Sequence, residues 1–143
     1  MHTVYLVHFD RFIPGGKNRH YIGTARNLEK RIADHRMGFS GPIFRLARDW
    51  RIGFEVARIW EFNDTQEAFD MERWLKEMRN APKYCPCCTT SPWRTSDAHI
   101  GACERYAERL KRERYAQQYY RELRLGGLDH QAARDISRGR ERA

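Results

Sequence analysis

Apolar residues in the first part of the chain follow a strand pattern interrupted by turn residues. Within residues 3–9, both the odd-numbered and the even-numbered positions are mainly apolar, which indicates a central strand with both faces covered. We expect Val4, Leu6 and His8 on one face and Tyr5, Val7 and Phe9 on the other. Residues 14–18 have turn chemistry and residues 20–23 return as a second strand, which predicts an antiparallel hairpin. The long turn leaves the register of this hairpin open.

Helical spacing begins after the second strand. Leu28 and Ile32 are four residues apart and offer an apolar edge, while Thr24 or Asn27 can cap the helix. After the breaker segment 38–42, we expect a short helix over residues 43–50 with its arginines, Arg45 and Arg48, exposed.

A third strand and a longer helix complete the predicted sheet unit. Alternation over residues 54–62 predicts a strand whose inward residues are Phe54, Val56, Trp60 and Phe62. We interpret Arg58, which interrupts that face, as an arginine whose stem extends over apolar neighbours. Asp64 can cap a helix with Glu67 as its box partner, and we expect that helix to run to about Arg79 and to be ended by Pro82. Ala68, Met71, Leu75 and Met78 form its apolar stripe.

These elements predict an α+β fold with a small antiparallel three-stranded sheet flanked by helices over residues 1–83. Residues 84–143 are expected to form a second unit, a Cys/His-containing loop followed by a mainly helical extension. Within it the pattern predicts a long helix over 97–125, in which Ser96 is the cap, and a short helix over 130–138 capped by Asp129. The long helix has apolar positions at Ile100, Cys103, Ala107 and Leu110.

Charge adds a preference for phosphate. Lys and Arg outnumber Asp and Glu by 27 to 19, which gives a net charge of +8, and most of the cations are arginine. The alternative is an ordinary solvated basic surface. No apolar run reaches the roughly 18 residues of a membrane span, and the chain starts without signal-peptide features, so we expect a cytoplasmic protein with no membrane partner.

Chemistry-bearing residues gather between Tyr21 and His35. Tyr21-Ile22-Gly23 passes from strand to turn, and Arg31 and His35 lie four residues apart on one helix face. With Tyr5 in Val4-Tyr5-Leu6 and a carboxylate at Glu72, residues 3–80 resemble the GIY-YIG nuclease family. The first motif has Val4 where the family has glycine.

The resemblance implies a one-metal site for phosphodiester hydrolysis. It implies catalytic roles for Tyr5, Tyr21, Arg31, His35 and Glu72, with Glu72 as the ligand of Mg²⁺ or Mn²⁺. From position alone, Glu72 could instead pair with Arg73 or Lys76. Whether a tyrosine or His35 takes the proton of the attacking water stays open, because an unperturbed tyrosine has a pKa near 10.

Cysteine spacing suggests a second metal site. Cys85 and Cys88 form a C-x2-C pair, and His99 and Cys103 follow four residues apart on one helix face. We expect these four residues to hold a structural Zn²⁺, with Cys87 either replacing one ligand or free. The alternative is a set of buried thiols without metal.

Basic and aromatic residues alternate along the second half of the long helix, which suits a nucleic-acid backbone and unstacked bases. We expect DNA contacts from Arg26, Lys30, Arg114, Arg121 and Arg124. A solvated helix or a seam for self-association is the alternative.

The sequence thus predicts a metal-dependent DNA endonuclease, bacterial or phage-encoded. The alternatives are a catalytically retired nucleic-acid-binding or regulatory protein on the same scaffold, and a role of the zinc segment in binding another protein. These hypotheses differ in DNA turnover and in metal content.

Overall fold

A single antiparallel sheet lies at the centre of the molecule. The computed structural model describes residues 1–16, 19–88 and 97–141, so the expected turn residues 17 and 18 and the expected cap Ser96 lie outside the described residues. The strands are β1 (His2–Phe9), β2 (His20–Ala25) and β3 (Phe54–Phe62), in the order β2-β1-β3. β1 is therefore the central strand, as its two apolar faces predicted.

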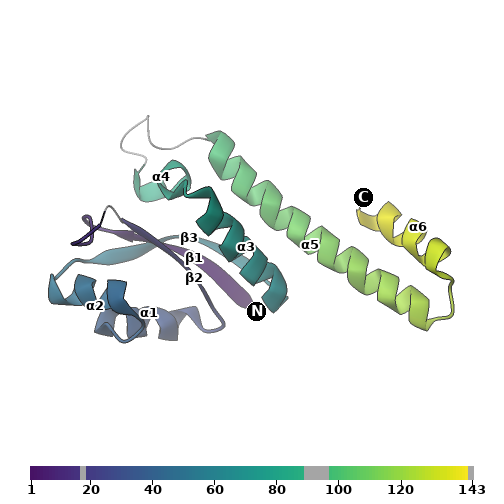
Figure 1. Cartoon of the computed structure of the whole chain (residues 1–143), viewed down its shortest axis with the longest axis horizontal. Coiled ribbons are helices and arrows are strands. Elements are labelled where there is room, and N and C mark those ends of the chain that lie inside the picture. Colours follow the sequence, from purple (N-terminus) through teal and green to yellow (C-terminus); the bar gives the residue numbers. More distant parts are fainter. Residues whose placement is uncertain (17–18, 89–96, 142–143) are drawn as a thin grey trace.

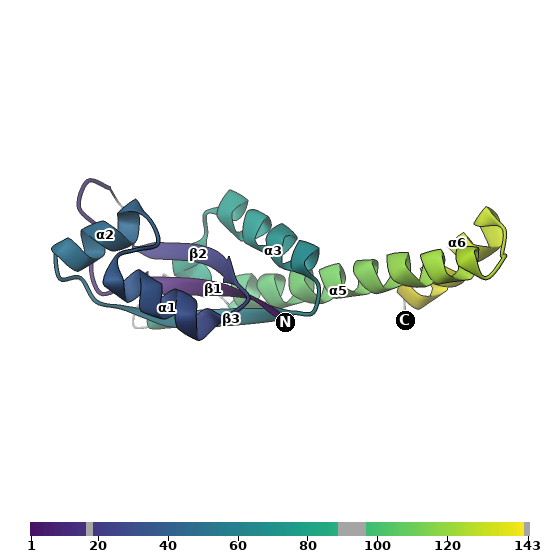
Figure 2. The same cartoon turned by 90° about the horizontal axis from the view of Figure 1, so that it is seen from below.

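Helices cover both faces of the sheet (Figure 1). One face carries α1 (Leu28–Met37) and α2 (Pro42–Asp49), and Figure 2 shows both from the side that they cover. The opposite face carries α3 (Thr65–Met78), followed by α4 (Ala81–Tyr84) and the 3₁₀ turn η1 (Pro86–Cys88). This arrangement confirms the predicted α+β class.

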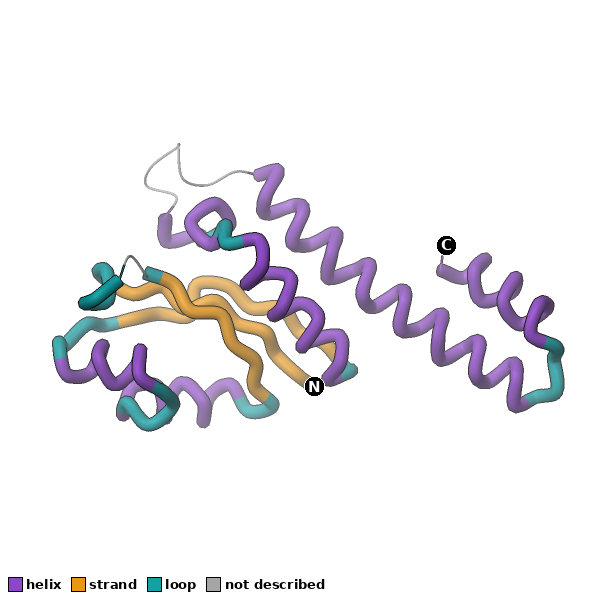
Figure 3. The backbone as a smooth tube through the Cα atoms, in the orientation of Figure 1, coloured by secondary structure: helices purple, strands orange, loops and turns teal. Residues whose placement is uncertain are grey.

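The C-terminal part is a helical hairpin. α5 (Asp97–Leu125) packs outside α3 and α4, and its second half extends beyond the sheet, where α6 (His130–Glu141) folds back along it (Figure 3). Gly127, with φ of 95°, lies in the turn between them. Asp129 Oδ1 accepts a hydrogen bond from the Ala132 amide and so caps α6 as predicted.

Side-chain caps fix the starts of α1 and α3. Asn27 Oδ1 accepts from the Lys30 amide at 3.0 Å, so Asn27 and not Thr24 is the cap of α1. Asp64 caps α3 as predicted, through the amides of Gln66 and Glu67. Pro82 does not end α3. The helix stops at Met78, because Arg79 is left-handed with φ of 50°, and Pro82 lies in α4.

Two apolar cores lie on the two faces of the sheet. Tyr5, Val7 and Phe9 face the core under α1 and α2, whereas Val4 and Leu6 face the core under α3. The second core continues into α5 through Cys103, Ala107 and Leu110. The predicted boundary near residue 83 stays a prediction, and the apolar packing runs across it.

A β-bulge divides β3 into halves that face opposite cores. Leu6 pairs with Arg58 and Val7 with Val56, so Ala57 is the extra residue. Phe54 and Val56 therefore pack under α1 and α2, while Trp60 and Phe62 pack under α3. Both pairs are inward as predicted, but not on the same side.

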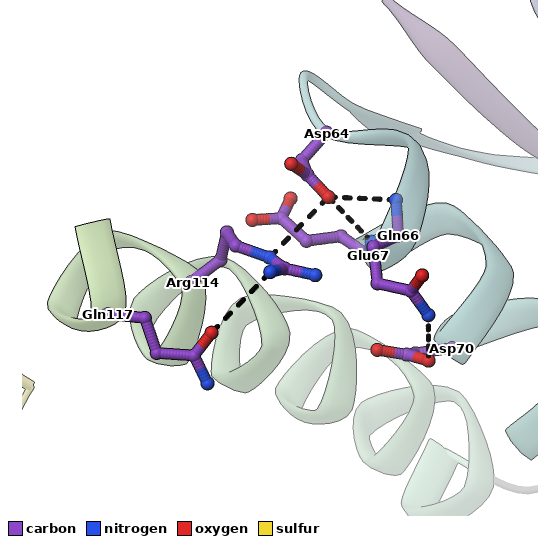
Figure 4. A network of polar contacts seen from close by, with 6 residues as sticks. All are labelled: Asp64, Gln66, Glu67, Asp70, Arg114 and Gln117. Atoms are coloured by element: carbon purple, nitrogen blue, oxygen red, sulfur yellow. Dashed lines mark hydrogen bonds and ion pairs between the residues drawn. The ribbon is translucent and has the colours of Figure 1, made fainter. Parts of the chain in front are cut away.

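Arg58 and Arg114 form polar contacts that connect α3, α4 and α5 on the face of the sheet opposite α1 and α2. Arg58 donates to the Tyr84 carbonyl and pairs with Glu104 at 3.3 Å, which joins β3 to α4 and α5. Arg114 on α5 pairs with Asp64 at the start of α3 at 3.5 Å (Figure 4). Trp74 of α3 also stacks on Tyr106 of α5, with ring centroids 4.3 Å apart.

Candidate active site

The hairpin register places the two motif tyrosines on one face of the sheet. Tyr5 lies opposite Gly23 and Val7 lies opposite Tyr21, so the tyrosines are diagonal neighbours with ring centroids 6.2 Å apart. A Cβ atom at Gly23 would lie 2.6 Å from the Tyr5 hydroxyl and 2.8 Å from Tyr21 Cε1. The glycine of the second motif therefore makes room for both rings.

His35 on α1 meets this tyrosine pair. Its Nε2 lies 2.7 Å from the Tyr5 hydroxyl, and its Nδ1 is hydrogen-bonded to Ser40 Oγ. The ring stacks on Phe44 of α2 with centroids 3.6 Å apart, and the side chain is 1% exposed. Both ring nitrogens thus have partners, and the orientation of the imidazole is fixed.

Sequence reasoning missed the two residues that hold His35. Ser40 follows the end of α1 and Phe44 lies on α2, and neither has a spacing that points to His35. The breaker segment 38–42 was the available signal. It returns the chain to the same face of the sheet, where α2 can cover the end of α1.

The electrostatics keep both partners neutral. Burial raises the pKa of Tyr5, Tyr21 raises it further, and the weaker effects of Arg31 and Glu72 oppose each other. Burial and the nearby Arg31 guanidinium lower the pKa of His35 to about 4. At neutral pH the pair therefore consists of a phenol and a neutral imidazole, which can accept a proton.

Arg31 and Glu72 come from helices on opposite faces of the sheet. Both lie close enough to Tyr5 to act on its pKa, in opposite directions. Both helices contact β2, which is an edge strand. A site that includes both side chains would therefore span this edge instead of lying on a single face.

A groove of about 600 Å³ runs along the β2 edge. Tyr21 lines it from the strand, and Arg19, Lys76 and Arg79 line it with positive charge. Lys76 also pairs with Glu72 at 2.7 Å, so Glu72 lies beside this groove. A groove with cations and a tyrosine hydroxyl suits a phosphate backbone.

A comparison with protein-family models decides the family. The model of the GIY-YIG catalytic domain matches residues 1–85 of the 143. The chain belongs to the GIY-YIG family. Comparison with the curated proteins and with the solved structures gave no match.

GIY-YIG membership confirms the resemblance that the sequence carries. Tyr5 stands in the first motif, whose first letter is Val4 here, and Tyr21 stands in an intact second motif. GIY-YIG proteins are nucleases that act on DNA and are generally metal-dependent. The match ends at Cys85, so α5 and α6 lie outside the GIY-YIG region.

Glu72 fits the single carboxylate ligand expected of a GIY-YIG site. Its side chain is 20% exposed and pairs with Lys76 at the helical i,i+4 spacing. A carboxylate oxygen is the ligand type that Mg²⁺ and Mn²⁺ prefer, and Mg²⁺ commonly keeps several waters and substrate oxygens. A single accessible carboxylate beside a groove for phosphate therefore suits such an ion.

The residues expected to contact DNA differ in their surroundings. Arg26 and Lys30 are exposed near the start of α1, and Arg121 is exposed on α5. Arg114 is half-buried in the pair with Asp64, and Arg124 donates to the Leu128 carbonyl at the end of α5. Arg114 and Arg124 thus already hold contacts within the protein.

The expected zinc residues do not all come together in the part of the chain that the structure describes. Cys85 and Cys88 form a group with His8 and His20. Cys103 is buried in the core under α3, and His99 Nδ1 is buried without a hydrogen-bond partner among the described residues. Cys87 turns away and donates to Glu55. Spacing along the chain could not indicate His8 and His20, because they lie on the hairpin strands 65 or more residues before Cys85.

None of the described helices is both long enough and apolar enough to span a membrane.

Proposed function

We propose that this GIY-YIG protein is a divalent-metal-dependent endonuclease that hydrolyses phosphodiester bonds in DNA. The observation that carries the proposal is the buried contact between Tyr5 and a neutral His35, with Tyr21 beside both rings. A hydrolase needs an acceptor for the proton of the attacking water.

A proton path from the groove to His35 fits these contacts. Tyr21 is half-buried and lines the groove, whereas Tyr5 and His35 are closed to solvent. The Tyr21 ring lies beside both, with its centroid 6.2 Å from that of Tyr5 and 5.5 Å from that of His35. We therefore assign Tyr21 to orienting the water and taking its proton while giving its own hydroxyl proton to Tyr5, which in turn gives its proton to Nε2 of His35. Ser40 holds the opposite ring nitrogen during the transfer.

Arg31 and a metal ion held by Glu72 would balance the negative charge of the phosphate. Arg31 is exposed, so its guanidinium is available to a non-bridging phosphate oxygen. Glu72 would hold Mg²⁺ or Mn²⁺. Such an ion would offset the negative charge on the oxygens of the pentacoordinate phosphorus and on the leaving oxygen.

We also propose that DNA follows the groove along β2 and continues past the start of α1. Arg19, Lys76 and Arg79 line the groove, and Arg26 and Lys30 are exposed near α1. On α5, Arg121 is the candidate that keeps an exposed charge for DNA, while Arg114 and Arg124 are engaged. We expect Arg121→Ala to weaken binding more than Arg124→Ala and to reduce its salt dependence.

The test is cleavage of labelled single-stranded and duplex DNA in Mg²⁺ or Mn²⁺. We expect Arg31→Ala and Glu72→Gln each to slow cleavage about 100-fold or more, because each removes charge stabilisation from the transition state. Arg45→Ala on α2 and Glu77→Gln on α3 are matched controls with exposed side chains.

Two outcomes contradict the proposal. Cleavage that persists unchanged in Glu72→Gln would exclude Glu72 as the metal ligand. Tight DNA binding without turnover in either metal would instead favour a catalytically retired scaffold. In that case the ion pair between Lys76 and Glu72 would have a structural role only.

A further inference from the structure

Four potential metal ligands converge where the β1–β2 hairpin meets the segment after α4. His8 and His20 are opposite each other in the register of the hairpin. Cys85 directly follows α4, Cys88 ends η1, and the Cys88 amide donates to the Cys85 carbonyl at 3.1 Å. The ligand atoms of these four residues all lie within 4.8 Å of one another.

Four of the six separations among these ligand atoms match the edges of a tetrahedron around zinc. Zn–N bonds of about 2.0 Å and Zn–S bonds of about 2.3 Å imply edges of about 3.3 Å between two nitrogens and about 3.5 Å between nitrogen and sulfur. The two imidazole nitrogens, His8 Nδ1 and His20 Nε2, are 3.2 Å apart. The nitrogen-to-sulfur distances are 3.4 Å (His8 to Cys85), 3.7 Å (His8 to Cys88) and 3.5 Å (His20 to Cys88).

Hydrogen bonding alone does not account for this geometry. His8 Nδ1 faces His20 Nε2 and the sulfurs of Cys85 and Cys88 at the same time. A ring nitrogen offers either one proton or one lone pair, so it can make one good hydrogen bond and not three. A cation between the four atoms would use one lone pair from each.

We propose that His8, His20, Cys85 and Cys88 bind a structural Zn²⁺. Two imidazoles and two thiolates in tetrahedral array are a donor set that selects zinc, and binding would release the two thiol protons. Cys85 and Cys88 are buried in the core under α3, and His8 is 6% exposed. With four protein ligands and little access for solvent, the site is closed and has no position for a substrate.

The zinc would link the β1–β2 hairpin to the segment Cys85–Cys88, where the GIY-YIG region ends. That segment otherwise meets the sheet through the Arg58 bond to the Tyr84 carbonyl, the Cys87 bond to Glu55 and packing of the core. His20 directly precedes Tyr21 on the edge strand. A metal that fixes His20 therefore also fixes the strand that presents Tyr21 to the groove, which makes the four ligands positioning residues for catalysis.

This ligand set shares only Cys85 and Cys88 with the set that sequence spacing suggests. The spacing set adds His99 and Cys103, which would give three sulfurs and one nitrogen. The proposed set has two of each. Counting sulfur and nitrogen neighbours of the bound metal thus separates the two.

The experiment measures the metal in the full-length protein purified from zinc-supplemented culture. We expect one zinc per chain by elemental analysis, and an X-ray absorption spectrum that fits two sulfurs and two nitrogens. Three sulfurs and one nitrogen would overturn the proposal in favour of the spacing set. No zinc, together with no uptake of added Zn²⁺ by the reduced protein, would overturn it outright, as would a Cys85–Cys88 disulfide in the protein as purified.

Variants test the assignment residue by residue. We expect His20→Ala and Cys88→Ser to lose most of the zinc, and Cys87→Ser, His99→Ala and Cys103→Ser to keep it. Because ligand variants could fail to fold, Co²⁺ is also titrated into chelated wild-type protein, where tetrahedral coordination gives intense visible absorption. An octahedral Co²⁺ spectrum, or zinc retention in both ligand variants, would contradict the site. DNA cleavage is not needed for any of these readouts.

Discussion

The Tyr5 hydroxyl lies 2.7 Å from Nε2 of His35, and both side chains are closed to solvent. Tyr5→Phe removes the hydroxyl and leaves a buried ring nitrogen without its partner. We expect the variant to lose about 1 to 3 kcal/mol of unfolding free energy and cleavage to slow about 100-fold or more. Denaturant unfolding and single-turnover cleavage measure the two effects.

Tyr106→Phe is the matched control for that change, because the ring can keep its stack on Trp74 in the α3–α5 layer. If Tyr5→Phe cleaved DNA at the wild-type rate, the proton path through Tyr5 would be wrong, whatever its stability.

Gly23→Ala tests the space shared by the two tyrosines. The added methyl would lie 2.6 Å from the Tyr5 hydroxyl, so this hydroxyl, which is 2.7 Å from His35 Nε2, has to shift. We expect reduced stability and cleavage reduced at least tenfold, since displacement of about 1 Å can cost a hundredfold in rate. Gly139→Ala in α6 is the control, because nothing lies within 4 Å of its added Cβ. Equal activity of the two variants would mean that the tyrosines tolerate rearrangement.

The lowered pKa of His35 predicts the direction in which stability changes with pH. Its pKa falls from 6.5 to about 4 on folding, through burial and then Arg31, so the fold favours the neutral ring. This stabilisation is complete above the unfolded pKa and is lost as pH falls from about 6.5 to about 4, with a total of about 3 kcal/mol. We expect wild type to lose that much more stability than His35→Gln across this window. Parallel stability curves for the two proteins would contradict the assignment.

Lys76→Met tests the ion pair that competes with a cation for Glu72. The pair is half-exposed on the lysine side, so its removal should strengthen Mn²⁺ binding only about twofold to fivefold. Calorimetric titration of Mn²⁺ without DNA measures this, with Lys83→Met on α4 as the control. Weaker Mn²⁺ binding in Lys76→Met would show that the lysine organises the ligand instead of competing for it.

Asp64 serves both as the cap of α3 and as the partner of Arg114 (Figure 4). Asn caps a helix about as well as Asp, so Asp64→Asn removes only the charge and should cost at most about 1 kcal/mol. Asp64→Ala removes both functions and should cost about 1 kcal/mol more. Thermal unfolding of the two variants and of Arg114→Ala checks the order, and equal losses for Asn and Ala would mean that the cap contributes little.

Local chemistry made much of the fold predictable. The alternation in β1 assigned Tyr5 and Val4 to opposite cores, because adjacent strand residues point to opposite faces. Asp64 and Asp129 marked the starts of their helices, since a carboxylate accepts from the first free amides. The predicted long helix over 97–125 coincides with α5.

Contacts between distant segments were not predictable in this way. Spacing within the chain says nothing about the hairpin register that brings Tyr5 beside Tyr21, or about Ser40 closing on His35. The same holds for Cys85 and Cys88. Their helical neighbour Cys103 follows a familiar spacing, yet the sheet brings them to His8 and His20, which are 65 or more residues earlier in the chain.

The bulge at Ala57 determines which core the first half of β3 faces. Without the bulge, strict alternation over residues 54–62 would turn Phe54 and Val56 toward the same layer as Trp60 and Phe62. The aromatic cage of Phe9, Phe44 and Phe54 beside His35 would then open. One extra residue, in a strand that carries none of the five proposed catalytic residues, thus keeps Phe54 beside the His35 ring.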